Sequence, residues 1–400
     1  MTLDNAIGSV AGTTNARPNR VIPVLAALAL VLVWTLNLGS IQPNRIVPGE
    51  GFGLMAALGG SGALAITLGL LGAILLALLP LPRRFAWLAA LLALSLAWLP
   101  VLLSVFAAQH LPSNAPYART SIGAAFWCLL FLLSLMLLEV LDRLGSSRLT
   151  RLLLLAAIVG AWSIMFSADG LASLSLVREF QARPEQFFAA LGTHLALAFG
   201  AVACSLVIAF GLTLKMLASP GWRRPVLALV SFMQTIPSLA VFGLLIAPLS
   251  ALSNHFPLLQ ELGIHGIGWA PAALALVAYS LLPMVRNNYV ALCGIAPTLL
   301  NAGRGMGMSE RQLFFKLKLP LALPVMIEGV RITTVQAIGL TAVAALVGAG
   351  GFGTFIFQGL GQAAMDLVLL GALPTVMLAL VADAALSLLA SALKPSNPAH

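Results

Sequence analysis

Charge is what this sequence has least of. Only 8% of its 400 residues are Asp, Glu, Lys or Arg, whereas 60% are hydrophobic. A soluble protein of this length needs far more charge to cover its surface. Uncharged runs of about eighteen or more residues recur along the chain, as membrane-spanning helices require. The composition therefore excludes a soluble globular protein and predicts an all-α polytopic membrane protein.

Several chemical signatures are also missing. The three cysteines stand apart in apolar runs, so neither a disulfide framework nor a metal site is predicted. None of the four lysines follows the glycine of a nucleotide-binding P-loop, the five histidines lack metal-ligand spacing, and no Ser/His/Asp set stands out. Basic residues are scattered between apolar runs, which argues against a nucleic-acid partner. We therefore expect no catalytic residue and no bound cofactor in this chain.

The apolar runs predict about ten spans. Of the 21 basic residues, only Arg45, Arg119, Arg178 and Arg183 fall outside if both ends of the chain are cytoplasmic, as the positive-inside rule favours. We interpret the first run as a retained helix, because it is too long for a signal peptide and lacks a cleavage site. The predicted spans are about 21–38, 54–80, 84–108, 118–142, 149–167, 188–214, 223–249, 270–292, 321–347 and 366–391.

The chain divides at a more polar stretch, which we interpret as an extracytoplasmic linker containing an interfacial helix. The predicted helices before this stretch are rich in Leu and Ala and contain few polar residues. Those after it carry most of the polar and proline residues. The predicted parts are a cytoplasmic tail (1–20), a five-helix membrane extension (21–167), the linker (168–186), a second five-helix core (187–392) and a cytoplasmic tail (393–400).

The sequence QTIPS interrupts the seventh span. Pro237 removes a backbone donor, and Gln234, Thr235 and Ser238 are costly in hydrocarbon unless they face protein or water. Pro283 repeats this pattern in the eighth span, where we group Tyr279 with it. Broken helices with polar residues near the midplane often line a transport pathway. A proline kink that neighbouring helices stabilise is an equally open alternative.

A glycine-rich run, GAGGFG at 348–353, fits the dinucleotide-binding pattern G-x-G-x-x-G. That pattern has meaning only between a strand and a helix, whereas this run follows a membrane span. We therefore expect either a flexible turn or a shaped extracytoplasmic loop that places Gly350 and Gly351 at the mouth of a pathway.

Two acids lie within late spans, Glu328 in the ninth and Asp383 in the tenth. An ionisable group inside a span is a functional hypothesis by default. Because both lie toward the cytoplasmic side, we favour structural ion pairs with Arg286 or Arg331. Proton coupling is the alternative.

The segment NAGRGMGMSERQLFFKLKLP, residues 301–320, lies on the predicted cytoplasmic side between the eighth and ninth spans. Small residues fill its first turns, Gly307 breaks the helix, and Ser309 is placed to start a second short helix. Pro320 fits the first turn of the next span. An ordinary basic loop would explain the charges but not the Gly-to-Pro spacing.

This spacing resembles the E-A-A-x₃-G-x₉-I-x-L-P signature of permease subunits in binding-protein-dependent ABC importers. Ala302, Gly307, Leu317 and Leu319-Pro320 match the signature, whereas Asn301 replaces its glutamate and Gly303 its second alanine. The stretches MQTIPSLAVFGLL, LLPMVRNNY, GMGMSERQ and VGAGGFGTFIFQGL look like the branch that imports quaternary-amine osmoprotectants such as glycine betaine and choline. The resemblance covers about residues 187–392, and some osmoprotectant permeases carry a similar N-terminal extension.

The resemblance implies a type I ABC importer permease core in the inner membrane, working with partners. These would be cytoplasmic ATPases that bind ATP and Mg, a second permease of the same or a paralogous kind, and an extracytoplasmic substrate-binding protein. Arg304 or Arg311 would compensate for the charge missing at Asn301. Alternatives are a permease for another amino-acid-like substrate such as methionine, or an ion-coupled secondary transporter. The ATPase-docking residues would be Asn301, Ala302, Gly303, Arg304, Gly307, Ser309, Leu317, Leu319 and Pro320.

Overall fold

The computed structural model describes residues 20–44, 47, 49–112, 114 and 117–393. The chain forms two compact units, Met1–Gln181 and Ala182–His400, which we call the N-terminal and C-terminal units. The predicted tails lie almost wholly outside the described residues.

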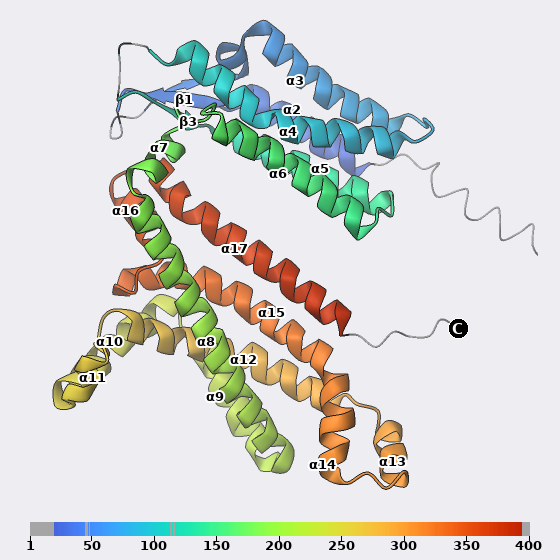
Figure 1. The fold of residues 1–400 in the computed structure, drawn as a ribbon, viewed down its shortest axis with the longest axis vertical. Helices are drawn as coiled ribbons and strands as arrows, with labels where there is room; N and C mark the ends of the chain where they lie inside the picture. Colours follow the sequence, from blue (N-terminus) through green and yellow to red (C-terminus); the bar gives the residue numbers. More distant parts are fainter. Residues whose placement is uncertain (1–19, 45–46, 48, 113, 115–116, 394–400) are drawn as a thin grey trace, which may run out of the picture. The chain divides into compact units, whose positions relative to one another are not determined.

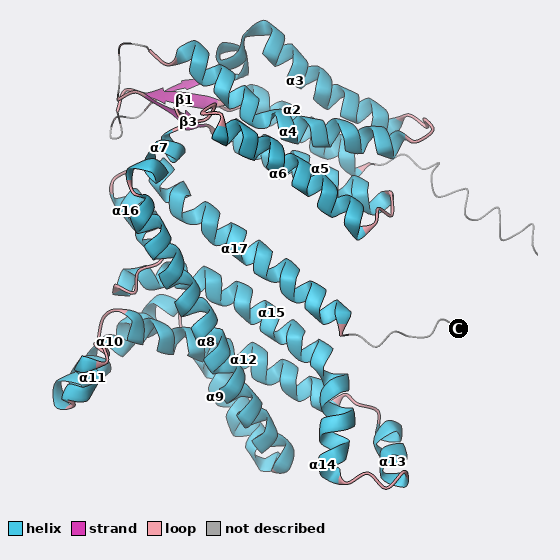
Figure 2. Ribbon diagram, viewed as in Figure 1, coloured by secondary structure: helices cyan, strands magenta, loops and turns pink. Residues whose placement is uncertain are grey.

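Helices and one small sheet build the N-terminal unit (Figure 1). The sheet has the antiparallel order β2-β1-β3 and gathers the end of α2 and the starts of α3 and α5 at one end of the bundle (Figure 2). The elements are α2 (Val21–Thr35), β1 (Gly39–Gln42), β2 (Glu50–Phe52), α3 (Leu54–Leu78), α4 (Arg84–His110), β3 (Arg119–Ile122), α5 (Ala124–Arg143), α6 (Arg148–Ser167) and α7 (Ser175–Ala182).

The sheet corrects two predicted spans. The span expected at 118–142 begins only at Ala124, because Arg119–Ile122 pairs with β1 instead. The span expected at 21–38 ends at Thr35, so α2 is about 22 Å long, short of the ~30 Å hydrocarbon core. Within the described residues, nine helices are long and apolar enough to cross a membrane, and α2 is a shorter apolar helix.

A proline in α4 explains how α6 is attached. Pro100 lacks the N–H that would bond the Leu96 carbonyl, and the Trp162 indole of α6 donates to that carbonyl at 3.0 Å. Because an unpaired backbone group is costly in a bilayer, this bond fixes α6 against α4 at one point.

We predict that Trp162→Phe lowers the apparent stability of the purified protein by about 1 to 2 kcal/mol, because the Leu96 carbonyl loses its donor. Thermal unfolding in detergent measures this loss. Trp87→Phe is the matched control, since Trp87 is 63% exposed and should change little. Equal effects of the two substitutions would contradict the assignment.

The C-terminal unit is entirely helical in its described residues. Its central helix, α15, packs on α8, α12 and α17, and α17 also packs on α16. The helices are α8 (Pro184–Ala218), α9 (Arg223–Thr235), α10 (Ser238–His255), α11 (Pro257–Glu261), α12 (Trp269–Cys293), α13 (Pro297–Gly305), α14 (Glu310–Leu313), α15 (Leu319–Ala344), α16 (Gly353–Gly361) and α17 (Met365–Ala392), with short 3-10 turns at Pro220–Trp222 (η1) and Ala345–Val347 (η3).

The sequence predicted that the ninth span begins at residue 321, but the helix that contains this span begins earlier. A π-helical turn, η2 (Phe314–Lys318), joins α14 to α15, so one helical run extends from Glu310 to Val347. Pro320 cannot donate to the carbonyl four residues before it, and its ring would crowd that carbonyl. The wider turn, in which the Leu319 N–H bonds the Phe314 carbonyl, lets the helix continue through the proline.

Candidate functional site

The predicted break at QTIPS is present. α9 ends at Thr235 and α10 begins at Ser238, with Ile236 and Pro237 in extended conformations between them. The Ala240 N–H bonds the Pro237 carbonyl, which leaves the Ile236 carbonyl outside the helical pattern. The predicted seventh span is therefore two helices.

Two side chains pair two carbonyls that have no helical donor. In α12, Pro283 leaves the Tyr279 carbonyl without its helical donor, and the Gln234 side-chain amide donates to it at 2.8 Å. In return, the buried Tyr279 hydroxyl donates to the Ile236 carbonyl. We call these reciprocal bonds the Gln234–Tyr279 clamp. It connects the α9–α10 break to the proline turn of α12.

We predict that Tyr279→Phe and Gln234→Leu each lower stability by about 1 to 3 kcal/mol, because each leaves a carbonyl without a donor. Since both bonds bracket one break, the double variant should lose less than the sum, by at least about 0.5 kcal/mol. Thermal unfolding of the four proteins measures the coupling. Tyr117→Phe, at a position 77% exposed, is the control. Strictly additive losses would argue against a joint clamp.

The other predicted pathway residues lie differently. The Thr235 hydroxyl donates to the Phe232 carbonyl of its own helix, and Ser238 is the first residue of α10. Gly350 and Gly351 lie against Thr193 and His194 of α8 rather than in the clamp. A role for these residues in a pathway stays a prediction.

A histidine that the sequence analysis did not single out holds the glycine-rich loop. His194 is fully buried; its Nε2 lies 3.0 Å from the Ile338 carbonyl of α15, and its Nδ1 accepts from the Phe352 N–H at 3.4 Å. These two partners fit a neutral ring with the proton on Nε2. A lone histidine in an apolar span was the available signal, because such a group must find partners in the bilayer.

The loop has a fixed shape for steric reasons. Gly351 has φ +79°, and a Cβ there would lie 3.2 Å from His194 Nδ1; a Cβ on Gly353 would lie 1.8 Å from the Ala342 carbonyl oxygen. No strand occurs among the described residues of the C-terminal unit, so the dinucleotide pattern lacks its βαβ setting. The run is a shaped connection between α15 and α16.

The predicted docking segment forms two short helices. α13 ends at Gly305, Gly307 turns the chain with φ +79°, and Ser309 with Gln312 forms a complete capping box at the start of α14. This confirms the predicted break and second helix. The exposed positions here include Asn301, Ala302 and Arg311.

Charge in this segment is organised around Arg304. Its guanidinium lies 2.9 Å from the Glu310 carboxylate and 3.4 Å from the Asn301 side-chain oxygen. The Glu310 hydrogen bond raises the pKa of Arg304, which is therefore always charged. Arg311, in contrast, is exposed and has no ion pair among the residues that the structure describes. Of the two arginines expected to compensate for Asn301, Arg311 is the one whose charge is free.

Gly303 is placed differently from its neighbours. It is buried, and a Cβ there would lie 2.6 Å from Leu313 Cδ1 and 3.3 Å from Met308 Sδ. Its small size therefore serves the close packing of α13 on α14. Direct contact of Gly303 with an ATPase stays a prediction.

We predict that Gly303→Val separates α13 from α14, because overpacking costs about 1 to 3 kcal/mol. Limited proteolysis within 301–313 should become several-fold faster. Adding Leu313→Ala removes the opposing methyl groups and should restore most of the protection. Gly305→Val is the control, since no atom lies within 4 Å of a Cβ there. Failure of the second substitution to rescue would refute the contact.

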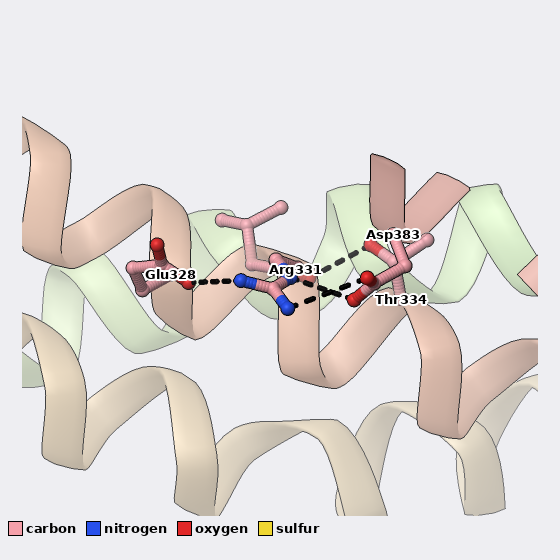
Figure 3. A network of polar contacts seen from close by, with 5 residues as sticks. Glu328, Arg331, Thr334 and Asp383 are labelled. Atoms are coloured by element: carbon pink, nitrogen blue, oxygen red, sulfur yellow. Dashed lines mark hydrogen bonds and ion pairs between the residues drawn. The ribbon is translucent and has the colours of Figure 1, made fainter. Parts of the chain in front are cut away.

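Glu328 and Asp383, the acids in the last two predicted spans, both form ion pairs with Arg331 (Figure 3). Arg331 bonds Asp383 through Nε at 2.6 Å and Nη2 at 3.3 Å, and bonds Glu328 through Nη1 at 3.0 Å. The Arg331–Asp383 pair joins α15 to α17, whereas the Arg331–Glu328 pair lies within α15. Arg286 is exposed and takes no part in them. A purely structural role for this network stays a prediction.

A second polar residue was missed by the sequence analysis. Gln336 lies midway along α15, is half-buried, and has no hydrogen-bond partner among the described residues. Nearby Gly339 is exposed, and a Cβ added there would meet no atom within 4 Å. An unpaired amide at this depth requires water or another protein surface. Gln336 is thus a further candidate for a pathway residue.

Both halves of the chain match known protein families. Residues 197–395 match the binding-protein-dependent transport system inner membrane component, and residues 17–177 match the N-terminal domain of the ABC transporter permease YehY. The chain belongs to the permeases of binding-protein-dependent ABC importers. It is an inner-membrane transport subunit, and ATP hydrolysis is done by a separate ATPase.

Individual relatives are similar to about half of the chain. The chain is 34% identical over 221 residues to the carnitine transport permease protein OpuCB of Listeria monocytogenes, covering 55% of this chain and 94% of the relative. It is 39% identical over 204 residues to the osmoprotectant import permease protein OsmW of Salmonella typhimurium, covering 51% and 90%. A choline transport system permease protein, OpuBB of Bacillus subtilis, is 32% identical over 204 residues, covering 51% and 87%.

Proposed function

We propose that this chain forms the translocation pathway of an ATP-driven importer for quaternary-amine osmoprotectants such as glycine betaine, choline or carnitine. The observation that carries the proposal is the similarity of about half of the chain to permeases named for carnitine, osmoprotectants and choline, each covered over most of its length. The clamp, the shaped loop and the two-helix segment all lie in the C-terminal unit.

The geometry suggests how the parts work together. The α9–α10 break and the α12 proline turn give the pathway two segments that can change conformation, and the Gln234–Tyr279 clamp makes them move as one. ATP-driven closure of two ATPases docked on the 301–317 segment would shift the permease between inward- and outward-facing states. A second permease completes the pathway, and an external binding protein delivers the substrate.

Substrate choice is divided between subunits in this proposal. A trimethylammonium group carries a fixed charge and no hydrogen-bond donor, so an aromatic cage recognises it best. We assign that cage to the binding protein. The permease need only offer a polar route, to which Gln336 and the QTIPS break contribute.

Uptake of labelled glycine betaine, choline and carnitine tests the proposal in proteoliposomes that contain the chain, its ATPase and the binding protein. We predict uptake that stops when the ATPase is inactivated. Gly307→Val should reduce uptake at least tenfold, because a β-branched residue does not adopt φ +79°. The variant should remain in the membrane, as immunoblotting would show.

Two outcomes would overturn parts of this assignment. Uptake that persists without ATP hydrolysis would favour an ion-coupled transporter. ATP-dependent uptake that only methionine or another amino acid supports would keep the importer and reject the quaternary-amine substrate.

A further inference from the structure

An apolar groove lies within the N-terminal unit. α3, α4 and α5 leave a space of about 610 Å³ between them. Small residues on one face of α3 leave room for the groove, and leucines of α4 and α5 line its base. The α3 face comprises Gly62, Ala65, Gly69 and Ala73, and the base includes Leu92, Leu99, Leu129 and Leu133.

Polar groups occur mainly at one end of the groove. Gln109 lies next to the end of α4, and Ser61 lies near the start of α3; both are exposed and have no hydrogen-bond partner among the described residues. Ser95, further along, already donates to the Leu91 carbonyl. The lining contains no charged side chain. The free polar groups therefore lie toward the end of the unit that carries the sheet.

The groove matches a chain-like ligand in length. From Ser61 to Ala73, beyond the break at Gly59, it follows α3 for about 18 Å, which is longer than half of the ~30 Å hydrocarbon core. Its volume equals that of about twenty water molecules, but an apolar lining does not hold water. An empty groove would forfeit dispersion contacts along its whole wall.

Exposed apolar side chains line its opening. Leu94 and Trp98 line the groove and are 64% and 56% exposed, and they continue into the apolar outer surface that a membrane-embedded unit presents to lipid. The groove is therefore continuous with the lipid-facing surface, which makes a lipid tail the occupant with direct access.

We propose that this groove binds one acyl chain of a phospholipid, extended along α3, with its glycerol ester region near Ser61 and Gln109. Because the lining carries no charge, the site recognises the tail and its polar junction rather than the charge of the headgroup. This inference concerns the N-terminal unit and does not depend on the proposed substrate.

Quenching of Trp98 by bromine tests the proposal on the full-length protein in detergent. Phosphatidylcholine with brominated tails is titrated in, and the Trp98 signal is the difference between the protein and its Trp98→Phe variant. We expect that signal to be quenched saturably at about one lipid per chain. Gly69→Leu should reduce the saturable part at least fivefold, because its side chain enters open space in the groove.

Gly160→Leu on α6 is the matched control, since a Cβ there also meets no atom and Gly160 does not line the groove. It should leave the saturable quenching intact. Native mass spectrometry should show the same order, with one retained phospholipid lost only in Gly69→Leu. Quenching that rises linearly with lipid in every protein, or an unchanged retained lipid in Gly69→Leu, would overturn the site. Crosslinking of position 69 to another protein segment would assign the groove to protein packing instead.

Discussion

The need to pair every backbone polar group inside the bilayer governs this structure. A helix meets that need by itself until a proline removes a donor. At two such places a side chain from another helix restores the pairing, Trp162 at the Leu96 carbonyl and Gln234 at the Tyr279 carbonyl, and Tyr279 does the same for the Ile236 carbonyl at the α9–α10 break. The places where the helical hydrogen bonding is interrupted are therefore also places where one helix is bonded to another. The breaks that could move are also the points where helices are held together.

The two units use this constraint differently. In the N-terminal unit, the carbonyl that Pro100 frees attaches α6, and the surrounding helices are apolar and, apart from the break at Gly59 in α3, regular. In the C-terminal unit, the two prolines near Gln234 and Tyr279 share one pair of bonds, so a change at either break must break or remake both. Such a reciprocal arrangement favours two discrete states over gradual bending, which is what an alternating pathway requires.

Hydropathy and proline chemistry predicted most of this from the sequence. Most of the ten predicted spans, the QTIPS break and the Gly307–Ser309 helix start follow from local rules that a single segment obeys. The sheet and the clamp bonds did not follow, because each depends on a partner far along the chain. The π turn did not follow either, because a proline in this position usually marks the start of a helix. β3 looks like the start of a span until β1 pairs with it, and the packing of Gly303 on Leu313 is visible only once α13 and α14 are placed together.

The unpredicted π turn has the largest consequence for coupling. Because η2 carries the helix through Pro320, α14 and α15 form one run of 38 residues, about 57 Å long. Leu313 at its start packs on Gly303 of α13, Arg331 ties its middle to Asp383, and the Ile338 carbonyl meets His194 beside the glycine-rich loop. A displacement of α13 therefore acts directly on this helical run, which ends at that loop. The π turn, with its weaker hydrogen bonding, is a place along this helical run where such a displacement can be absorbed as bending.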